Sequence, residues 1–293
     1  MRSEKEMFDL ILGIAKDDER IRAVYMNGSR TNPNIPKDIF QDYDIVYVVK
    51  ETSSFLKDEK WINVFGELLM IQEPDKLDQI CGMEMDFDRS YGYLMLFKDG
   101  NRIDLHIETK ESMLEGYTND SLTIPLLDKD NCLPKIPKAT DVDYWVNKPT
   151  EPQFMRNCNN FWWCMQNVAK GIWREELPYV KKMYECVVRE MLDEMVSWWV
   201  GINHDYKVST GKMGKYFKKY LPKSYWDLYQ GTYSDSNYDN IWDSVFKACD
   251  LFRSLSKDVS NYFTFTYPTN DDKNMTQYLT HVRNLLKNAK GIY

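Results

Sequence analysis

Two short motifs near the start of the chain contain the residues whose types and spacing point most directly to chemistry. Gly28-Ser29 follows one apolar segment, and Asp42-Tyr43-Asp44 opens a second. In a strand, residues two positions apart lie on the same face, so Asp42 and Asp44 are expected to direct their carboxylates toward one point. Such a pair repels itself unless a cation lies between the two groups, and Mg²⁺ takes oxygen ligands of this kind together with substrate phosphates.

The turn that precedes the acids suits a phosphate group. Gly28 lets the backbone approach a phosphate closely, and Ser29 adds a hydroxyl, although a helix cap is a compatible role for that serine. Arg30 suits either a phosphate or a surface salt bridge. Twelve residues, 30–41, separate Gly28-Ser29 from Asp42. Together the motifs predict metal-assisted chemistry on a nucleoside triphosphate.

A third acid is expected on a hairpin. Asp99-Gly100 is typical of the turn between two strands, here Tyr91–Phe97 and Arg102–Ile107. Asp104 and His106 share one face of the second arm, opposite its apolar residues. Beside the first two acids, Asp104 would complete a site for two ions. The alternatives for Asp104 are an acceptor for the proton of an attacking hydroxyl and an exposed hairpin residue.

Patterning predicts an α+β protein, with a mixed sheet and helices in residues 1–135 and an α-helical domain in residues 136–293. A capping box at Ser3 and Glu6 opens the first helix. Strands are expected at Ile21–Met26 and Asp44–Val49, a helix at Trp61–Met70, and a proline-rich connection between domains over 121–152. The expected helices of the second half are 152–171, 177–200, 212–220, 238–256 and 271–289.

Composition limits the partners. Of 293 residues, 43% are hydrophobic and 28% are charged, as in a globular protein. The formal net charge of −7 argues against a general nucleic-acid partner and suits a cationic small molecule. No apolar run approaches the ~20 residues of a membrane span, and the charged first residues predict a cytoplasmic protein without a membrane partner. The oligomeric state stays open, with a monomer favoured.

One local exception to the acidic balance is the segment 211–224, which has five lysines and no acid. We assign Lys212 and Lys215 to a triphosphate across a cleft. A solvated helix face is the alternative, and a nucleic-acid patch interleaved with aromatic residues is a third interpretation. The second Asp-x-Asp, Asp86-Phe87-Asp88, lacks a preceding Gly-Ser turn and is not assigned.

Several segments recur in one known family. They are Asn27–Arg30, Asp42–Ile45, Tyr93–Leu105, Val168–Tyr179 and Val208–Tyr216. On these motifs the whole chain resembles the aminoglycoside 6-adenylyltransferases, or streptomycin adenylyltransferases, of the nucleotidyltransferase superfamily. The resemblance implies an N-terminal polymerase-beta-like domain and a C-terminal helical domain that bind substrates between them. It also implies ATP, Mg²⁺ (two ions) and streptomycin, whose streptidine 6-hydroxyl receives AMP in an antibiotic-resistance reaction.

The resemblance also gives a possible task to two acids at a predicted helix start. Glu175 and Glu176 precede Pro178, where acids are favoured on electrostatic grounds alone. Their functional alternative is bidentate pairing with the guanidinium groups of streptomycin.

Two other functions compete. One is a nucleotidyltransferase acting on RNA or protein, and the acidic balance argues against a general RNA substrate. The other is a non-catalytic nucleotide-binding or antitoxin-type module, and the intact set Asp42, Asp44 and Asp104 argues against it.

Overall fold

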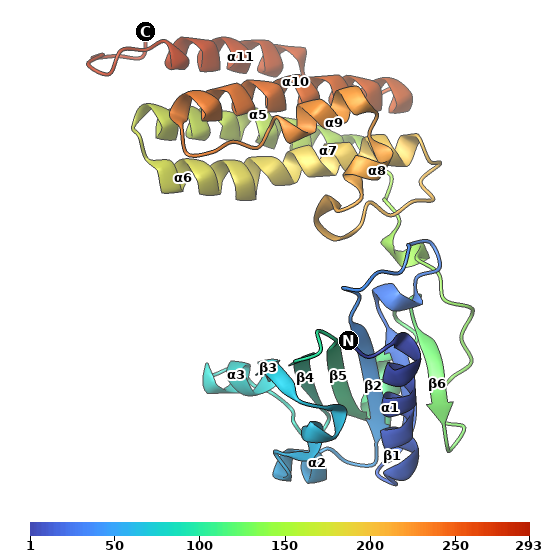
Figure 1. Ribbon diagram of the computed structural model, residues 1–293. Coiled ribbons are helices and arrows are strands. Elements are labelled where there is room, and N and C mark those ends of the chain that lie inside the picture. Colours follow the sequence, from blue (N-terminus) through green and yellow to red (C-terminus); the bar gives the residue numbers. More distant parts are fainter. The chain divides into compact units, whose positions relative to one another are not determined.

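The computed structural model describes residues 1–293 and contains two compact units, Met1–Asp143 and Tyr144–Tyr293 (Figure 1). The first unit is built on a mixed sheet with helices, and the second is helical. The predicted fold class is therefore confirmed. None of the helices combines the length and the apolar composition that crossing a bilayer requires.

The sheet of the first unit has six strands in the order β3-β4-β5-β2-β1-β6. Only β2 and β5 are parallel; the other neighbours are antiparallel. The strands are β1 (Ile21–Asn27), β2 (Tyr43–Val49), β3 (Leu68–Gln72), β4 (Ser90–Phe97), β5 (Arg102–Thr109) and β6 (Ile124–Asp128). The predicted hairpin is β4–β5, and Gly100 takes a positive φ of 86° at its turn. This topology places the strands that carry the acids side by side at the centre of the sheet.

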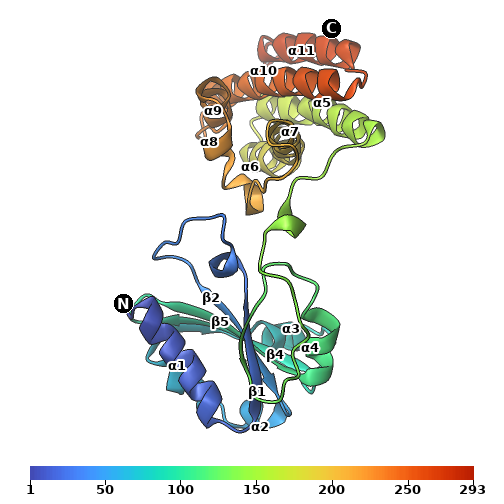
Figure 2. The same ribbon diagram turned by 90° about the vertical axis from the view of Figure 1, so that its right-hand side faces the viewer.

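Helices cover the two faces of this sheet, as Figure 2 shows. The helix α1 (Glu4–Asp17) begins at the predicted capping box and buries Met7 and Ile11 against alternate residues of β2 such as Ile45. On the opposite face, α4 (Lys110–Gly116) contributes Met113 to a smaller cluster with Val46. Tyr43 and Ile45 face α1. Asp44 lies between them in the sequence, so its side chain is on the α4 face. The remaining short helices are α2 (Ser53–Lys57) and α3 (Pro74–Ile80), with 3₁₀ turns at Ser29–Thr31, Trp61–Phe65 and Val142–Tyr144.

Two predictions for this unit were wrong. The expected helix Trp61–Met70 is only a 3₁₀ turn, because Gly66 takes a φ of 127° and the following residues pair as β3 with β4. The expected connection over 121–152 contains the edge strand β6, where a register shift accompanies Pro125. Proline is tolerated on an edge strand because its missing N–H costs no ladder bond.

The second unit packs seven helices around an aromatic core. Phe161 and Phe252 stack with ring centroids 3.7 Å apart, and Trp162 meets Phe252 edge-on. The helices are α5 (Glu151–Trp173), α6 (Leu177–Lys182), α7 (Arg189–Ile202), α8 (Phe217–Tyr220), α9 (Lys223–Gln230), α10 (Tyr238–Phe263) and α11 (Thr269–Arg283), and a π-helical segment, Met183–Val188, joins α6 to α7.

Two helix predictions in this unit fail in part. The expected helix over 212–220 is broken by positive φ angles at Met213 and Gly214, which leave a 3₁₀ turn, Lys212–Gly214, and the short α8. The last helix ends at Arg283 and not at residue 289. Beyond it, the carbonyl of Leu285 accepts a hydrogen bond from the indole of Trp173, so this segment packs on the end of α5.

Candidate active site

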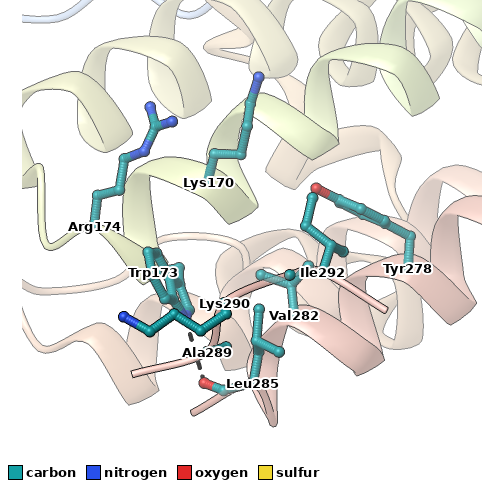
Figure 3. A pocket seen from close by; sticks show the side chains of 10 residues that line it. Lys170, Trp173, Arg174, Tyr278, Val282, Leu285, Ala289, Lys290 and Ile292 are labelled. Carbon is teal, nitrogen blue, oxygen red and sulfur yellow. Dashed lines mark hydrogen bonds between the residues drawn. The ribbon is translucent and has the colours of Figure 1, made fainter. Parts of the chain in front are cut away.

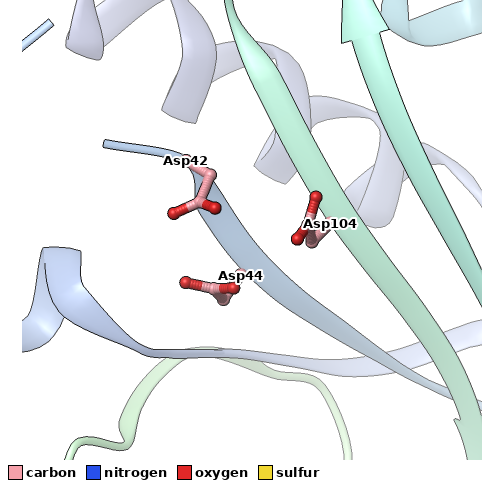
Figure 4. Close-up of side chains that lie close together, drawn as sticks. All are labelled: Asp42, Asp44 and Asp104. Carbon is pink, nitrogen blue, oxygen red and sulfur yellow. The ribbon is translucent and has the colours of Figure 1, made fainter. Parts of the chain in front are cut away.

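The structure brings the three predicted acids together. In the parallel pairing of β2 with β5, Asp44 lies directly opposite Asp104, and Asp42 precedes β2 by one residue. One carboxylate oxygen from each of the three lies within 4.8 Å of the others. Figure 4 shows the side chains directed toward a common space from two neighbouring strands. The strand alternation that buries Tyr43 and Ile45 places the acids on the other face.

The closeness of these carboxylates perturbs their ionisation. Burial raises the pKa of Asp44 to about 7, and the neighbouring Asp42 and Asp104 add to the effect. The positive charge of Arg102 partly opposes this rise in the pKa of Asp44. Arg102 donates two hydrogen bonds to Asp104, at 2.7 and 2.6 Å. The same guanidinium lies 3.9 Å from a carboxylate oxygen of Asp42. Sequence reasoning did not assign Arg102, although its position two residues before Asp104 on one strand face was a usable signal.

This donor set fits a hard divalent cation. Its ligands are carboxylate oxygens, the type that Mg²⁺ prefers. Three carboxylates converge here, and Arg102 is the one side chain that forms ion pairs with them, so the set keeps a net negative charge when all three are ionised. Asp42, Asp44 and Asp104 are therefore the residues that would hold such a cation.

The Gly28 turn lies directly against this set. A Cβ atom at Gly28 would be 2.0 Å from an oxygen of Asp44, and the residue takes a φ of 77°. Both facts require glycine here, since other residues are strained at this φ and would displace the carboxylate. Ser29 is the first residue of the 3₁₀ turn, which Gly28 precedes without a side-chain cap.

Arg30 uses its donors within its own unit. Its guanidinium donates to the main-chain carbonyls of Asp42 (3.1 Å) and Gln41 (2.6 Å) and lies 3.9 Å from the centre of the Tyr43 ring. A third contact, 3.3 Å, goes to the carboxylate of Glu4. Only 8% of the Arg30 side chain is exposed. These contacts fix the segment that leads into the paired acids.

A groove extends from the acids across the face of the sheet. Its volume is about 590 Å³, and the part beyond Asp104 is lined by His106, by Gly92 of β4 and by Asp75 of α3. The carboxylate of Asp75 accepts a hydrogen bond from the backbone N–H of Gly92 at 2.7 Å. His106 was noted in the sequence only as a neighbour of Asp104, and nothing in the sequence pointed to Asp75.

Comparison with known proteins decides the family. The family model described as streptomycin adenylyltransferase matches residues 1–282. The chain belongs to the streptomycin adenylyltransferase family. Proteins named aminoglycoside 6-adenylyltransferase are similar to it: one from Campylobacter jejuni is 41% identical over 93% of each chain, and one from Bacillus subtilis (strain 168) is 38% identical over 95% of this chain and 97% of the relative. This membership makes the protein an enzyme of the nucleotidyltransferase class.

A third relative and a solved structure extend the comparison. The aminoglycoside 6-adenylyltransferase of Staphylococcus aureus is 34% identical over 95% of this chain and 98% of its own length. The crystal structure of an aminoglycoside 6-adenyltransferase from Bacillus subtilis is 33% identical over 97% of this chain and 100% of that chain, with a TM-score of 0.48. The sequence likeness to the three relatives covers at least 93% of this chain and so includes residues of both units.

The lysines predicted to contact the triphosphate lie on an irregular segment of the second unit. Lys212 opens a 3₁₀ turn between two positive-φ glycines, Gly211 and Gly214, and Lys215 follows it. Both lysines are exposed, and neither forms an ion pair. Their charges are therefore available to an anionic ligand.

Glu175 and Glu176 lie at the turn between α5 and α6. Glu175 is exposed, takes a φ of 59° and pairs with Lys287 at 2.8 Å. Glu176 is exposed at the N-cap of α6 and forms no ion pair. A nearby pocket between α5, α11 and the C-terminal segment contains three cationic side chains and no carboxylate (Figure 3). That pocket does not suit a cationic ligand; its cations are Lys170, Arg174 and Lys290.

Proposed function

We propose that this enzyme transfers AMP from ATP to the 6-hydroxyl of streptomycin and releases pyrophosphate. One observation carries the proposal: three carboxylates lie within 4.8 Å of one another beside a glycine turn, in a chain of the streptomycin adenylyltransferase family. The relatives named aminoglycoside 6-adenylyltransferase support the acceptor class. The net charge of −7 also suits a cationic acceptor.

In the proposed reaction, a hydroxyl oxygen of the acceptor forms a bond to the α-phosphorus of ATP. The bond between that phosphorus and the oxygen bridging to the β-phosphate breaks, pyrophosphate departs, and the proton of the hydroxyl passes to Asp104 or to solvent. Positioning and charge neutralisation account for most of the catalysis in such transfers. Two Mg²⁺ ions held by Asp42, Asp44 and Asp104 would neutralise the charge of the triphosphate when bound.

The other predicted residues take supporting roles in this proposal. The turn at Gly28 and the hydroxyl of Ser29 receive the β- and γ-phosphates, and Lys212 and Lys215 add positive charge to the triphosphate. Arg30 supports the site indirectly, by holding the segment that leads into Asp42, because its donors already bind the main-chain carbonyls of Gln41 and Asp42.

The two glutamates differ in what they offer the acceptor. Glu176 lacks the ion pair that occupies Glu175, so Glu176 is the better of the two as a partner for a guanidinium group.

The test is incubation of the purified protein with ATP, Mg²⁺ and a panel of aminoglycosides, followed by product mass and pyrophosphate release. We expect an AMP-sized mass gain on streptomycin and none on kanamycin. A transfer RNA and a protein mixture serve as the competing acceptors. Absence of a gain on every aminoglycoside would overturn the proposal, and a gain on RNA or protein alone would favour the competing transferase function.

A biological test addresses resistance. Production of the enzyme in the cytoplasm of a susceptible bacterium should raise the streptomycin concentration needed to stop growth. The Asp104→Asn variant is the control, because it keeps the size of the side chain and removes only one carboxylate of the acid set. Equal resistance from both proteins would mean that protection does not come from this site.

A further inference from the structure

The candidate site has a defined order across the sheet. Gly28 lies at the end of β1, Asp44 on β2, Asp104 and His106 on β5, and Gly92 on β4. These strands are successive neighbours in the order β4-β5-β2-β1. The phosphate-binding turn and the groove beyond Asp104 therefore lie on opposite sides of the acid set.

This order matters for an in-line displacement. In such a transfer the attacking and leaving oxygens lie on opposite sides of the phosphorus. If pyrophosphate departs toward the turn at Gly28, the attacking hydroxyl must approach from the β5–β4 side. The acceptor is then expected over His106 and Gly92.

The groove on that side offers unused hydrogen-bonding groups. His106 is half-buried, and neither of its ring nitrogens has a partner in the protein. Asp75 uses one carboxylate oxygen for the N–H of Gly92 and forms no ion pair. A Cβ placed on Gly92 would lie 3.5 Å from Asp75 Oδ2 and 3.7 Å from His106 Nδ1. The two side chains thus flank a small space that the glycine leaves open.

The charges of the groove favour a cation in that space. No lysine or arginine lines the groove, whereas three carboxylates do besides Asp44 and Asp104 of the acid set. A triphosphate would be repelled by Asp75, while an ammonium or guanidinium group would be attracted to it. An aminoglycoside carries several such cationic groups beside its hydroxyls.

We propose that Asp75 and His106 form an acceptor-binding subsite, in which Asp75 pairs with a cationic group of the aminoglycoside and His106 hydrogen-bonds to a neighbouring polar group. The inference rests on the proposed function and adds to it the part of the first unit that holds the acceptor. Gly92 belongs to the subsite because it leaves room for the ligand.

The first test removes the charge of Asp75. Asp75→Asn retains an oxygen for the N–H of Gly92, so the fold should be preserved. The Michaelis constant for streptomycin should rise about ten- to hundredfold, as for loss of a charged hydrogen bond, while that for ATP stays within about twofold. Asp78→Asn is the matched control, since it removes the same charge from α3 outside the groove and should change neither constant.

The second test fills the space itself. The Cβ of Gly92→Ala would make ordinary van der Waals contacts, and Gly92 does not take a positive φ, so the variant should fold. We expect its Michaelis constant for streptomycin to rise roughly five- to hundredfold, the range for overpacking a filled site. His106→Ala should weaken streptomycin binding in calorimetry without ATP, and His106→Asn should restore part of it by replacing the Nδ1 position.

These outcomes separate the inference from the proposed function. If the wild-type enzyme modifies streptomycin but Asp75→Asn and Gly92→Ala leave its Michaelis constant unchanged, the subsite is wrong and the function stands. An increase confined to the constant for ATP would also overturn the subsite. If the wild-type enzyme modifies no aminoglycoside, the proposed function fails first and the inference fails with it.

Discussion

Replacing Asp44 by asparagine is expected to stabilise the protein in the absence of a divalent cation and to abolish its turnover. Both effects follow from the removal of one negative charge, which is unfavourable in the empty site and necessary for binding the cation. Burial and the neighbouring Asp42 and Asp104 raise the pKa of Asp44 to about 7, so the folded protein resists the ionisation that cation binding requires. Asparagine keeps the size of the side chain and removes the charge.

The size of the effect follows from the two pKa values. Asp44 ionises near pH 7 in the folded state and near pH 3.9 in the unfolded chain, and each unit of difference corresponds to about 1.4 kcal/mol. Because the folded pKa is raised, the contribution of Asp44 to stability is fully present below about pH 3.9 and is lost as the pH rises through about 7. The free energy of unfolding of Asp44→Asn is then expected to exceed that of the wild type by about 1.5 kcal/mol at pH 5 and by about 4 kcal/mol at pH 8.

The assay is thermal unfolding of the wild type and of Asp44→Asn with a chelator present, at pH 5 and at pH 8, followed by the same scans with Mg²⁺. Between pH 5 and pH 8 the stability difference between variant and wild type should grow by about 2–3 kcal/mol. This growth corresponds to roughly 6–9 °C in the unfolding temperature of the first unit. Mg²⁺ should raise the unfolding temperature of the wild type at pH 8 and have little effect on the variant. Asp88→Asn, an exposed acid of the second Asp-x-Asp, is the control and should show neither effect.

Two results would refute this reasoning. A difference between variant and wild type that is the same at pH 5 and pH 8 would mean that Asp44 ionises normally in the folded protein. Stabilisation of the variant by Mg²⁺ to the same extent as the wild type, or near-normal turnover, would mean that the paired acids are not the metal site.

Four further variants test other parts of the site. Gly28→Ala should lower turnover at least about tenfold and cost about 1–3 kcal/mol of stability, since its Cβ would meet Asp44 at 2.0 Å and its backbone conformation is one that almost only glycine adopts; unchanged kinetics would contradict this. Arg30→Gln should destabilise the first unit by about 2–4 kcal/mol in urea unfolding, through two lost charged hydrogen bonds to main-chain carbonyls; an unchanged unfolding midpoint would contradict this. Arg102→Gln should lower the Mg²⁺ concentration needed for half-maximal activity, because the guanidinium competes for the same carboxylates; a higher requirement would speak against that competition. Lys212→Ala should raise the Michaelis constant for ATP about tenfold and leave that for streptomycin unchanged, as steady-state kinetics will show.

The parts of the site that sequence reasoning anticipated are those set by local periodicity. Asp42 and Asp44 stand two residues apart at the start of an apolar strand, and Asp104 alternates with buried apolar residues on a hairpin arm. Strand alternation alone places each of these acids on one face. A recognisable turn residue, Gly28, completed the pattern.

The parts that were missed depend on how separate elements pack. Asp75 reaches the groove only because α3 lies beside β4, and no pattern around Asp75 shows where α3 will pack. The apolar run that ends at Ile71 fits a helix and a buried strand equally well over so few residues, and pairing with β4 decided between them. Strand β6 was not predicted because it contains Pro125, and a proline argues against a strand unless the strand lies at the edge of a sheet.

The acid set also depends on the register between β2 and β5, which the hydrophobic core determines. Asp44 faces Asp104 because Tyr43 pairs with Ile103 and Ile45 with Leu105, and all four of these neighbours are buried on the α1 face. A slip of one residue would place a carboxylate in the core and an apolar side chain in the groove, which is strongly unfavourable because a buried, unpaired charge is costly. Core packing and site geometry are therefore one constraint: the alternation that buries the apolar residues of two parallel strands also aligns the carboxylates on their other face. A substitution that loosens the α1 face is thus expected to affect catalysis through the separation of Asp44 and Asp104, even though it touches neither acid.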